Sequence, residues 1–266
     1  MEPAKVQKVK IPLAVTLAVF AAVGRAGVPI PPDADLLPRL EKDLRGQRQT
    51  MIREVRRLGN RTLELELTAA IEADFEIVRE VFSQVPSYPS WVLEGINDRP
   101  SGGKFFFQVL SLEADPKIPS VLHAKFLVDL PLLKHRSRRA FRFDIRSGPQ
   151  SFTQAIEALP LEEGLIETAE GVLKIFPAAR APDLVWVYFR GMAVLRSWLL
   201  YEALPERILK KETGERLEIL LANYRKVEQR RMEKVALSTA NVATPSRNPR
   251  EKTVGPGVPR MPQIPR

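Results

Sequence analysis

The side chains that could carry out acid–base or metal chemistry are few in this sequence. Its 266 residues include no cysteine and two histidines, His123 and His135. His123 alternates with the apolar Leu122 and Ala124 along an expected strand, so its ring should point to solvent. His135 lies in the basic segment 134–139, for which we expect a solvated turn. A general base must lie against its substrate. Because neither histidine has a metal-binding neighbour in the sequence, we expect no catalytic residue, no metal ion and no cofactor.

Aromatic side chains are the other group that could hold a ligand. Each one alone is typical of a protein core. Together they could line an apolar binding site, provided that the elements that carry them leave space between them. The candidates lie on the expected strands and on the last helix: Phe105, Phe107, Phe126, Phe141, Phe143, Trp186, Tyr188 and Trp198.

Alternating apolar residues predict that most of these aromatics belong to an antiparallel sheet. Turn residues separate the period-two segments, and no helical pattern of about 10–15 residues lies between them, which argues against parallel α/β and all-helical folds. The expected strands are 61–67, 105–109, 122–128, 141–145, 172–176 and 184–189.

Helices are expected before and after these strands. A short helix follows Asp35, and a long helix follows the last strand. The long helix should break near Pro205, Gly214 or both, because proline lacks the backbone donor and glycine weakens a helix. The segment 51–58 fits either a continued first helix or one strand of a hairpin that turns at Gly59, and we favour the hairpin.

The segment 69–92 carries an informative order of elements, namely the end of a strand, an amphipathic helix at 76–82 and a turn. This order resembles the opening of the START-like superfamily, which includes polyketide cyclases, the plant pollen-allergen fold and coenzyme Q-binding proteins. The chain departs from the family pattern at Asp74, where a proline is usual, and at Gln84, where an aspartate is usual. The positions that carry the resemblance are Ile71 and Ala73 in the strand and Tyr88, Pro89 and Trp91 in the turn.

The resemblance continues to about residue 229, because the aromatic strand 184–189 leads into the long final helix. It implies an α+β helix-grip fold, in which a curved antiparallel sheet wraps around a long C-terminal helix and encloses an apolar cavity. It also implies that some of the aromatic candidates line that cavity. We expect the START-like domain to span residues 61–232.

The two ends of the chain differ from this domain in composition. Residues 1–26 combine three lysines, an apolar run at 11–23 and a small-x-small cleavage candidate at 24–26, which is the layout of a secretory signal peptide. The apolar run is shorter than the roughly 20 residues that span a bilayer. We therefore expect a bacterial periplasmic or secreted protein, with an uncleaved membrane anchor as the alternative. Residues 27–60 form an N-terminal extension and linker, and residues 233–266 form a basic, proline-rich tail that we expect to be disordered.

The net charge of +9 comes from these ends. The body from 27 to 229 has 29 basic and 29 acidic residues, so it lacks the basic excess of a nucleic-acid-binding protein. One strand still carries a group of arginines, for which we favour a solvated outer face. The alternative is a landing site for anionic lipid headgroups, where each charge contributes about 1 kcal/mol. These residues are Arg136, Arg138, Arg139 and Arg142.

The resemblance implies that a monomer binds or transports a hydrophobic, lipid-like or polycyclic molecule in the cell envelope, without catalysis. Movement of the final helix or of the loop 97–104 would release the molecule. Two alternatives stay open: an enzyme similar to polyketide aromatase/cyclases, and a protein-interaction module with a vestigial cavity.

Overall fold

The computed structural model describes residues 30–48, 50–95, 106–130, 133–160, 166–203 and 206–243. The chain divides into two units, residues 1–230 and 231–266, and the folded domain lies in the first. The expected signal peptide and most of the expected tail lie outside the described residues. Of the helices that are described, none is both long enough and apolar enough to cross a membrane.

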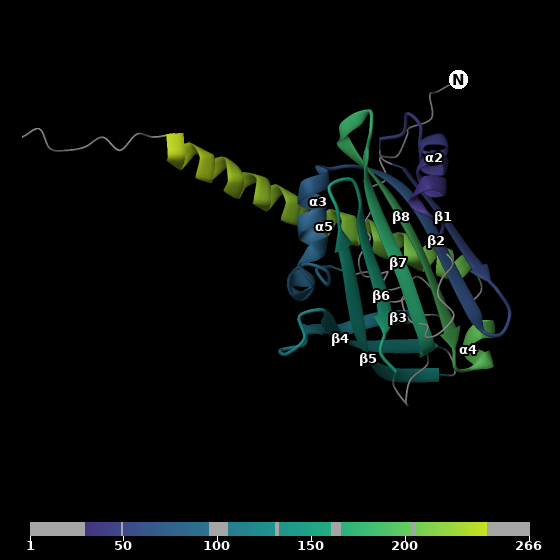
Figure 1. Cartoon of the computed structure of the whole chain (residues 1–266). Helices are drawn as coiled ribbons and strands as arrows, with labels where there is room; N and C mark the ends of the chain where they lie inside the picture. Colours follow the sequence, from purple (N-terminus) through teal and green to yellow (C-terminus); the bar gives the residue numbers. More distant parts are fainter. Residues whose placement is uncertain are drawn as a thin grey trace, which may run out of the picture. The chain divides into compact units, whose positions relative to one another are not determined.

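A single antiparallel sheet forms the body of the first unit (Figure 1). Its eight strands are ordered β1-β2-β8-β7-β6-β5-β4-β3, so β1 is an edge strand and β2 pairs with the last strand, β8. The strands are β1 (Thr50–Arg57), β2 (Thr62–Glu72), β3 (Phe106–Ala114), β4 (Val121–Leu130), β5 (Leu133–Ser147), β6 (Phe152–Ala158), β7 (Ile166–Ala178) and β8 (Ala181–Leu195).

Helical segments precede, interrupt and follow this sheet. Helix α3 begins at Asp74, whose carboxylate accepts hydrogen bonds from the backbone N–H groups of Glu76 and Ile77. An aspartate at this position therefore takes the role of an N-cap. The helical segments are α2 (Asp33–Asp43), α3 (Phe75–Ser83), the 3-10 helix η1 (Val85–Ser90), α4 (Trp198–Ala203) and α5 (Glu206–Ala243).

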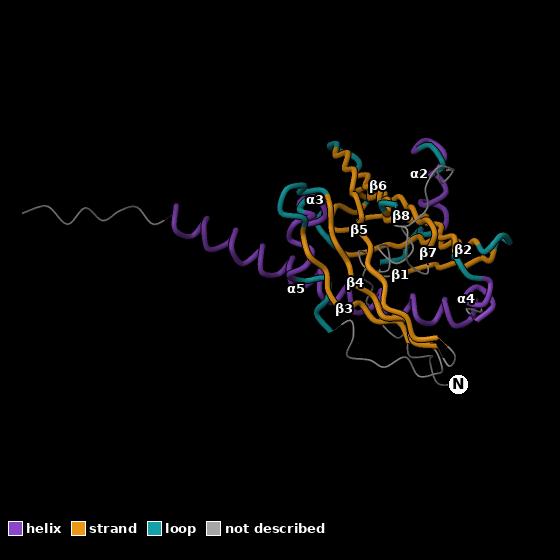
Figure 2. The backbone as a smooth tube through the Cα atoms, turned by 90° about the horizontal axis from the view of Figure 1, so that it is seen from below, coloured by secondary structure: helices purple, strands orange, loops and turns teal. Residues whose placement is uncertain are grey.

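The sheet has two differently covered faces. Successive strand residues point to opposite faces, and one set packs in a large apolar cluster with α3, η1 and the part of α5 that ends at Arg230. We call this the inner face, and Figure 2 shows the strands arching over α5 on this side. The opposite, outer face forms a smaller cluster with α2.

The structure confirms the predicted α+β helix-grip arrangement and the first hairpin. Residues 50–57 pair with 63–70, and the turn uses positive φ angles at Gly59 and Asn60. Strand β1 is part of the sheet and α2 packs on its outer face. These parts of the segment 27–60, which we assigned to an N-terminal extension and linker, therefore belong to the folded body.

The structure differs from the sequence prediction at two strands. Strand β6 was not predicted. The basic segment 134–139 is not a turn but part of β5, paired with β4. Of the two positions at which the last helix was expected to break, Gly214 lies within the continuous helix α5, and Pro205 lies outside the described residues.

Candidate ligand-binding face

An aromatic cluster occupies the inner face at the end of the domain where α3 packs. Tyr88 of η1 lies edge to face with Trp91, their ring centroids 5.6 Å apart, and 5.7 Å from Phe143 of β5. Phe82 of α3 stacks on Tyr224 of α5 at 6.0 Å. The turn residues behind the START-like resemblance thus join α3, α5 and the sheet.

The polar groups inside this cluster have partners. The Tyr88 hydroxyl donates to the Phe82 carbonyl oxygen at 2.7 Å, and Gln154 Nε2 donates to the Tyr88 oxygen at 2.8 Å. Burial raises the pKa of Tyr88, and the hydrogen bond from Gln154 opposes that change. The phenol therefore stays protonated and serves packing. Trp91 Nε1 differs, since it is buried without a hydrogen-bond partner among the described residues.

A second aromatic pair lies farther along the inner face, on β4 and β5. Phe126 and Phe141 are buried and meet edge to face with ring centroids 6.1 Å apart. Phe141 shares its face of β5 with Phe143, two residues on. The inner face therefore carries three of the predicted aromatic residues in one apolar layer.

Arg139 belongs to this layer, although we expected it on a solvated face. It precedes Phe141 by two residues, pairs in register with the buried Ala124, and is 2% exposed. Its Nη1 and Nη2 donate long hydrogen bonds to the carbonyl oxygens of Leu159 and Glu167, at 3.4 and 3.5 Å. Nε is buried without a partner. Burial lowers the pKa of Arg139, and the charge of Arg196 lowers it further. The other three arginines of the group are exposed or outward-facing, as expected: Arg136, Arg138 and Arg142.

A second arginine, Arg53, reaches the inner face from β1, between Met51 and Val55. Its Nη1 is buried without a hydrogen-bond partner. Burial lowers the pKa of Arg53, while the carboxylate of Glu218 on α5 raises it. Arg53 therefore faces an opposite charge across the sheet–helix interface.

The structure separates the remaining candidates from this face. Trp186 and Tyr188 alternate with the inner-face residues of β8 and pack against α2 on the outer face, so they cannot line a space beneath α5. Trp198 is 56% exposed, because the separate helix α4 places Tyr201 in the core instead. Phe105 lies outside the described residues, and Phe107 is described only as a backbone position of β3.

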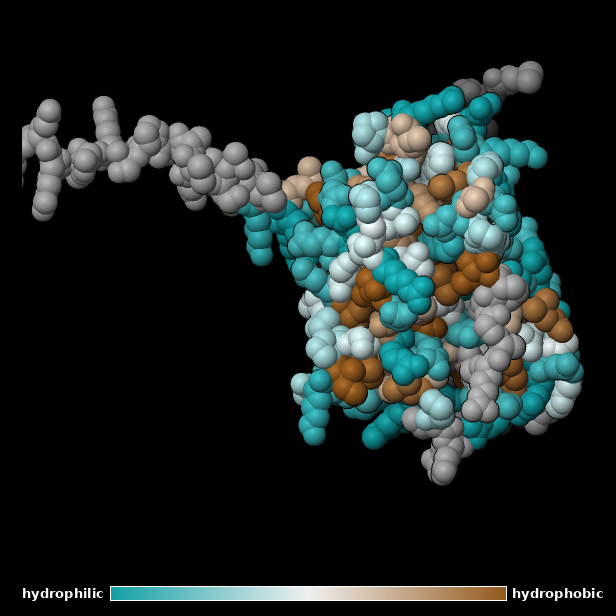
Figure 3. All heavy atoms as spheres, viewed as in Figure 1, coloured by the Kyte–Doolittle hydropathy of each residue, from teal (hydrophilic) through white to brown (hydrophobic). Residues whose placement is uncertain are grey.

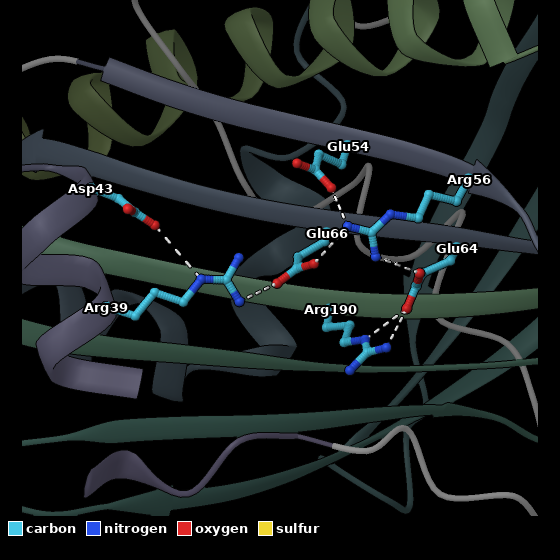
Figure 4. A network of polar contacts seen from close by, with 7 residues as sticks. All are labelled: Arg39, Asp43, Glu54, Arg56, Glu64, Glu66 and Arg190. Atoms are coloured by element: carbon cyan, nitrogen blue, oxygen red, sulfur yellow. Dashed lines mark hydrogen bonds and ion pairs between the residues drawn. The ribbon is translucent and has the colours of Figure 1, made fainter. Parts of the chain in front are cut away.

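An ionic network lies on the outer face and links α2 to β1, β2 and β8 (Figure 4). The buried Glu64 accepts from Arg190 Nε at 2.7 Å and pairs with Arg56 at 3.2 Å. Glu66 pairs with Arg39 of α2 at 3.0 Å and with Arg56 at 3.5 Å. Because each buried carboxylate is held by two guanidinium groups, the network fastens α2 and supplies no free acid or base.

A cleft of about 380 Å³ lies at the start of α3. Its lining includes Asp74, Phe75 and three prolines: Pro149 between β5 and β6, Pro177 near the end of β7 and Pro182 near the start of β8. The Asp74 carboxylate already caps the helix, so this cleft has no available helix N-terminus. On the face shown in Figure 3, hydrophobic side chains lie in separate groups between hydrophilic ones.

Of the two predictions about the positions of the histidines, one is confirmed and the other is wrong. His123 is exposed as predicted and contacts Asp115, with Nε2 2.8 Å from Oδ2. His135 lies in β5 instead of a turn. Within the described residues, no group of three or more histidine, aspartate and glutamate side chains could hold a metal ion.

Comparisons with known proteins concern the fold. No family model and no curated protein matches the sequence. Among solved structures, a START superfamily protein from Mycobacterium smegmatis is similar, with 15% identity and a TM-score of 0.36, over 63% of this chain and 97% of that one. A STAR-related lipid transfer protein from Xanthomonas axonopodis has 14% identity and a TM-score of 0.36, over 65% and 98% of the two chains.

An aromatase/cyclase from a Streptomyces species shows 14% identity and a TM-score of 0.40, over 64% of this chain and 96% of that one. The sheet topology and the helix across its inner face define a START-like fold, as the sequence predicted. At these identities the likeness extends to the fold alone, and neither lipid transfer nor cyclase activity follows from it.

Proposed function

We propose that the protein binds a hydrophobic, lipid-like or polycyclic molecule on the inner face of its sheet, beneath α5, and carries it without chemical change. The observation that supports this most is the aromatic layer of the inner face. Phe126 of β4 packs edge to face on Phe141 of β5, Phe143 follows on the same face of β5, and the indole nitrogen of Trp91, without a partner among the described residues, lies near one end. An apolar molecule on such a layer gains about 25 cal/mol for each Å² of apolar surface removed from water.

A carrier fits the ionisable groups of this face better than an enzyme. Proton transfer needs a group with a pKa near the working pH beside the substrate. Among the described strand residues of the inner face, the fully buried polar side chains are Arg139 and Gln154. An arginine stays protonated and an amide does not titrate, so neither moves protons near neutral pH.

The cell envelope is part of the proposal and rests on the sequence of residues 1–26. N-terminal sequencing of protein from the native host tests it separately from ligand binding. We expect a mature N-terminus at or near Gly27 in an exported fraction. A retained Met1 in the cytoplasmic fraction would contradict export but not binding.

Native mass spectrometry of the full chain, purified from its host, tests the binding itself. The expected spectrum contains a bound apolar molecule, which an apolar fluorescent probe displaces with a stoichiometry of one. Phe143→Leu should weaken probe binding, because it removes part of the aromatic layer. The matched outer-face variant Trp186→Phe should leave it unchanged. Protein that arrives empty and binds no apolar probe at micromolar concentration would support the interaction-module alternative instead.

A further inference from the structure

Arg139 is a buried cation with which no carboxylate of the described residues forms an ion pair. Transfer of a charge out of water is costly, and buried charges are therefore normally paired. Among the described residues, the guanidinium contacts two carbonyl oxygens at 3.4 and 3.5 Å, and Nε contacts none. The side chain of Glu167 is engaged elsewhere, 3.2 Å from Arg61. The positive charge of Arg196 lowers the pKa of Arg139 in addition to burial.

The other buried charges of the domain show that this arrangement is unusual. Glu64 on the outer face has both Arg190 and Arg56. Arg53 on the inner face has the opposite charge of Glu218 across from it. Arg139 is more deeply buried than Arg53, yet the described residues offer it no carboxylate. Structural pairing therefore accounts for those charges and not for this one.

The surroundings of Arg139 indicate what kind of anion would reach it. On its own face of the sheet it lies beside Phe141 and opposite Ala124, with the ring of Phe126 next along β4. These neighbours are apolar, so they offer a small anion no contacts that would offset the free energy lost with its hydration shell. An anion that carries an apolar body gains the burial of that body. A free inorganic ion fits such surroundings poorly.

The length of the inner face allows an elongated molecule. Arg139 contacts the start of β7 at Glu167, whereas the Tyr88–Gln154 group lies beside Leu173 of the same strand. These two positions are six residues apart, or about 20 Å at the usual strand rise of 3.3 Å. At the α3 end the hydroxyl of Tyr88 and the amide of Gln154 have hydrogen-bond partners, whereas Nε of Arg139, at the opposite end, has none among the described residues.

We propose that Arg139 binds the acid group of the carried molecule, which is therefore an amphipathic acid with an apolar body and one carboxylate or phosphate. This assignment rests on the proposed function, since it specifies one end of the same ligand. The anion accepts from Nε of Arg139, and the apolar body extends along Phe126 and Phe141 towards the aromatic cluster. A charge-assisted hydrogen bond of this kind is stronger than a neutral one.

The test compares three sixteen-carbon molecules that share one chain: palmitate, its methyl ester and hexadecyl phosphate. Each displaces an apolar fluorescent probe from the full-length protein. We expect palmitate or the phosphate to bind at least about tenfold more tightly than the ester, as one charge-assisted hydrogen bond provides. The tighter of the two acids identifies the headgroup chemistry.

Two variants assign the preference to Arg139. Arg139→Met keeps the length and apolar stem of the side chain and removes the charge, so acid affinity should fall to that of the ester. Arg138→Met makes the same change one residue away on the exposed outer face, and should retain the full preference. Since no carboxylate of the described residues pairs with Arg139, its replacement by methionine should leave the melting temperature unchanged or raise it. A lower melting temperature with an unchanged acid preference would show a structural role and overturn the assignment.

The affinities of the unaltered protein for the three molecules test the role of Arg139 even if Arg139→Met does not fold. Equal affinity for palmitate, the phosphate and the ester contradicts the role of Arg139 and leaves the proposed function intact. Failure of the probe and of all three molecules to bind contradicts the proposed function itself.

Discussion

The guanidinium of Arg53 lies against the backbone of Gly214, so closely that a Cβ atom at Gly214 would come within 1.7 Å of Arg53 Nη1. Arg53 comes from the edge strand β1, and Gly214 from within α5. Glycine in a helix interior costs about 1 kcal/mol relative to alanine. The contact with Arg53 explains why glycine stands here and why α5 passes through it unbroken.

Gly214→Ala should therefore change stability differently in two backgrounds. With Arg53→Ala also present, alanine at 214 should stabilise the protein by up to about 1 kcal/mol, because only the helix propensity changes. With Arg53 retained, the new methyl group displaces the guanidinium, and this gain should disappear or reverse. Urea unfolding of the four proteins of this double-mutant cycle measures the coupling. Equal gains in both backgrounds would show that the two residues do not interact.

Arg190→Met should destabilise the domain by roughly 1–3 kcal/mol, because it leaves the buried carboxylate of Glu64 with Arg56 as its remaining partner. The matched control is Arg146→Met. Arg146 pairs with Asp144 on the exposed face of β5, and such surface changes stay within about 0.5 kcal/mol. Chemical denaturation compares the two. Similar effects at both sites would mean that the pair of Arg190 with the buried Glu64 stabilises the domain no more than an exposed ion pair does.

Tryptophan emission should report ligand binding through Trp91 and not through Trp198. Trp91 is 4% exposed within the inner-face cluster, whereas Trp198 is 56% exposed on α4. An apolar probe on the inner face should therefore quench or shift the emission of Trp198→Phe as much as that of the unaltered protein. Trp91→Phe should lose most of the change while the probe still binds. The opposite pattern would place the ligand near α4.

Glu228 should make the domain less stable at higher pH. Burial raises the pKa of Glu228, and the hydrogen bond from the Tyr224 hydroxyl opposes this rise. The folded protein thus binds a proton more readily than the unfolded chain at this residue. Its stabilising effect is complete below the unfolded pKa and is lost as the pH rises through the folded pKa.

Glu228→Gln should consequently be more stable than the unaltered protein above that range, with a difference that shrinks in acid. The control is Asp115→Asn. The hydrogen bond with His123, followed by bonds from two backbone N–H groups, lowers the pKa of Asp115. The stability that Asp115 contributes is therefore present above its unfolded pKa and lost as the pH falls. Melting temperatures from pH 4 to pH 8 distinguish the two, and parallel curves for both variants would contradict the assignment to Glu228.

Much of the sheet was predictable because one-sided burial leaves a period of two in the sequence. Strand β6 escaped because polar Gln154 occupies a buried position, where Tyr88 and the Phe82 carbonyl give it partners that only the fold supplies. The burial of Arg139 was not predicted for a related reason, because a charged side chain is normally expected on a solvent-exposed face. Its alternation with Phe141 and Phe143 was the signal that could have placed it on the inner face.

Periodicity could not assign the faces of β8. Both faces of this strand are buried, one by α5 and the other by α2, so Tyr188 and Phe189 carry the same apolar signal. The position of Trp198 depended on the packing of the short helix α4, which buries Tyr201 and leaves Trp198 exposed. Both features arise from tertiary packing and leave no local pattern.

Photo-crosslinking with a fatty acid that carries a diazirine near the end of its chain tests the central claim most directly. After irradiation of the full-length protein, tandem mass spectrometry identifies the labelled residues. The account predicts label on inner-face positions such as Phe143, Ile156 and Tyr224, suppressed by unlabelled palmitate. Label on the outer-face residues Trp186 and Tyr188, or label that palmitate does not suppress, would contradict binding beneath α5.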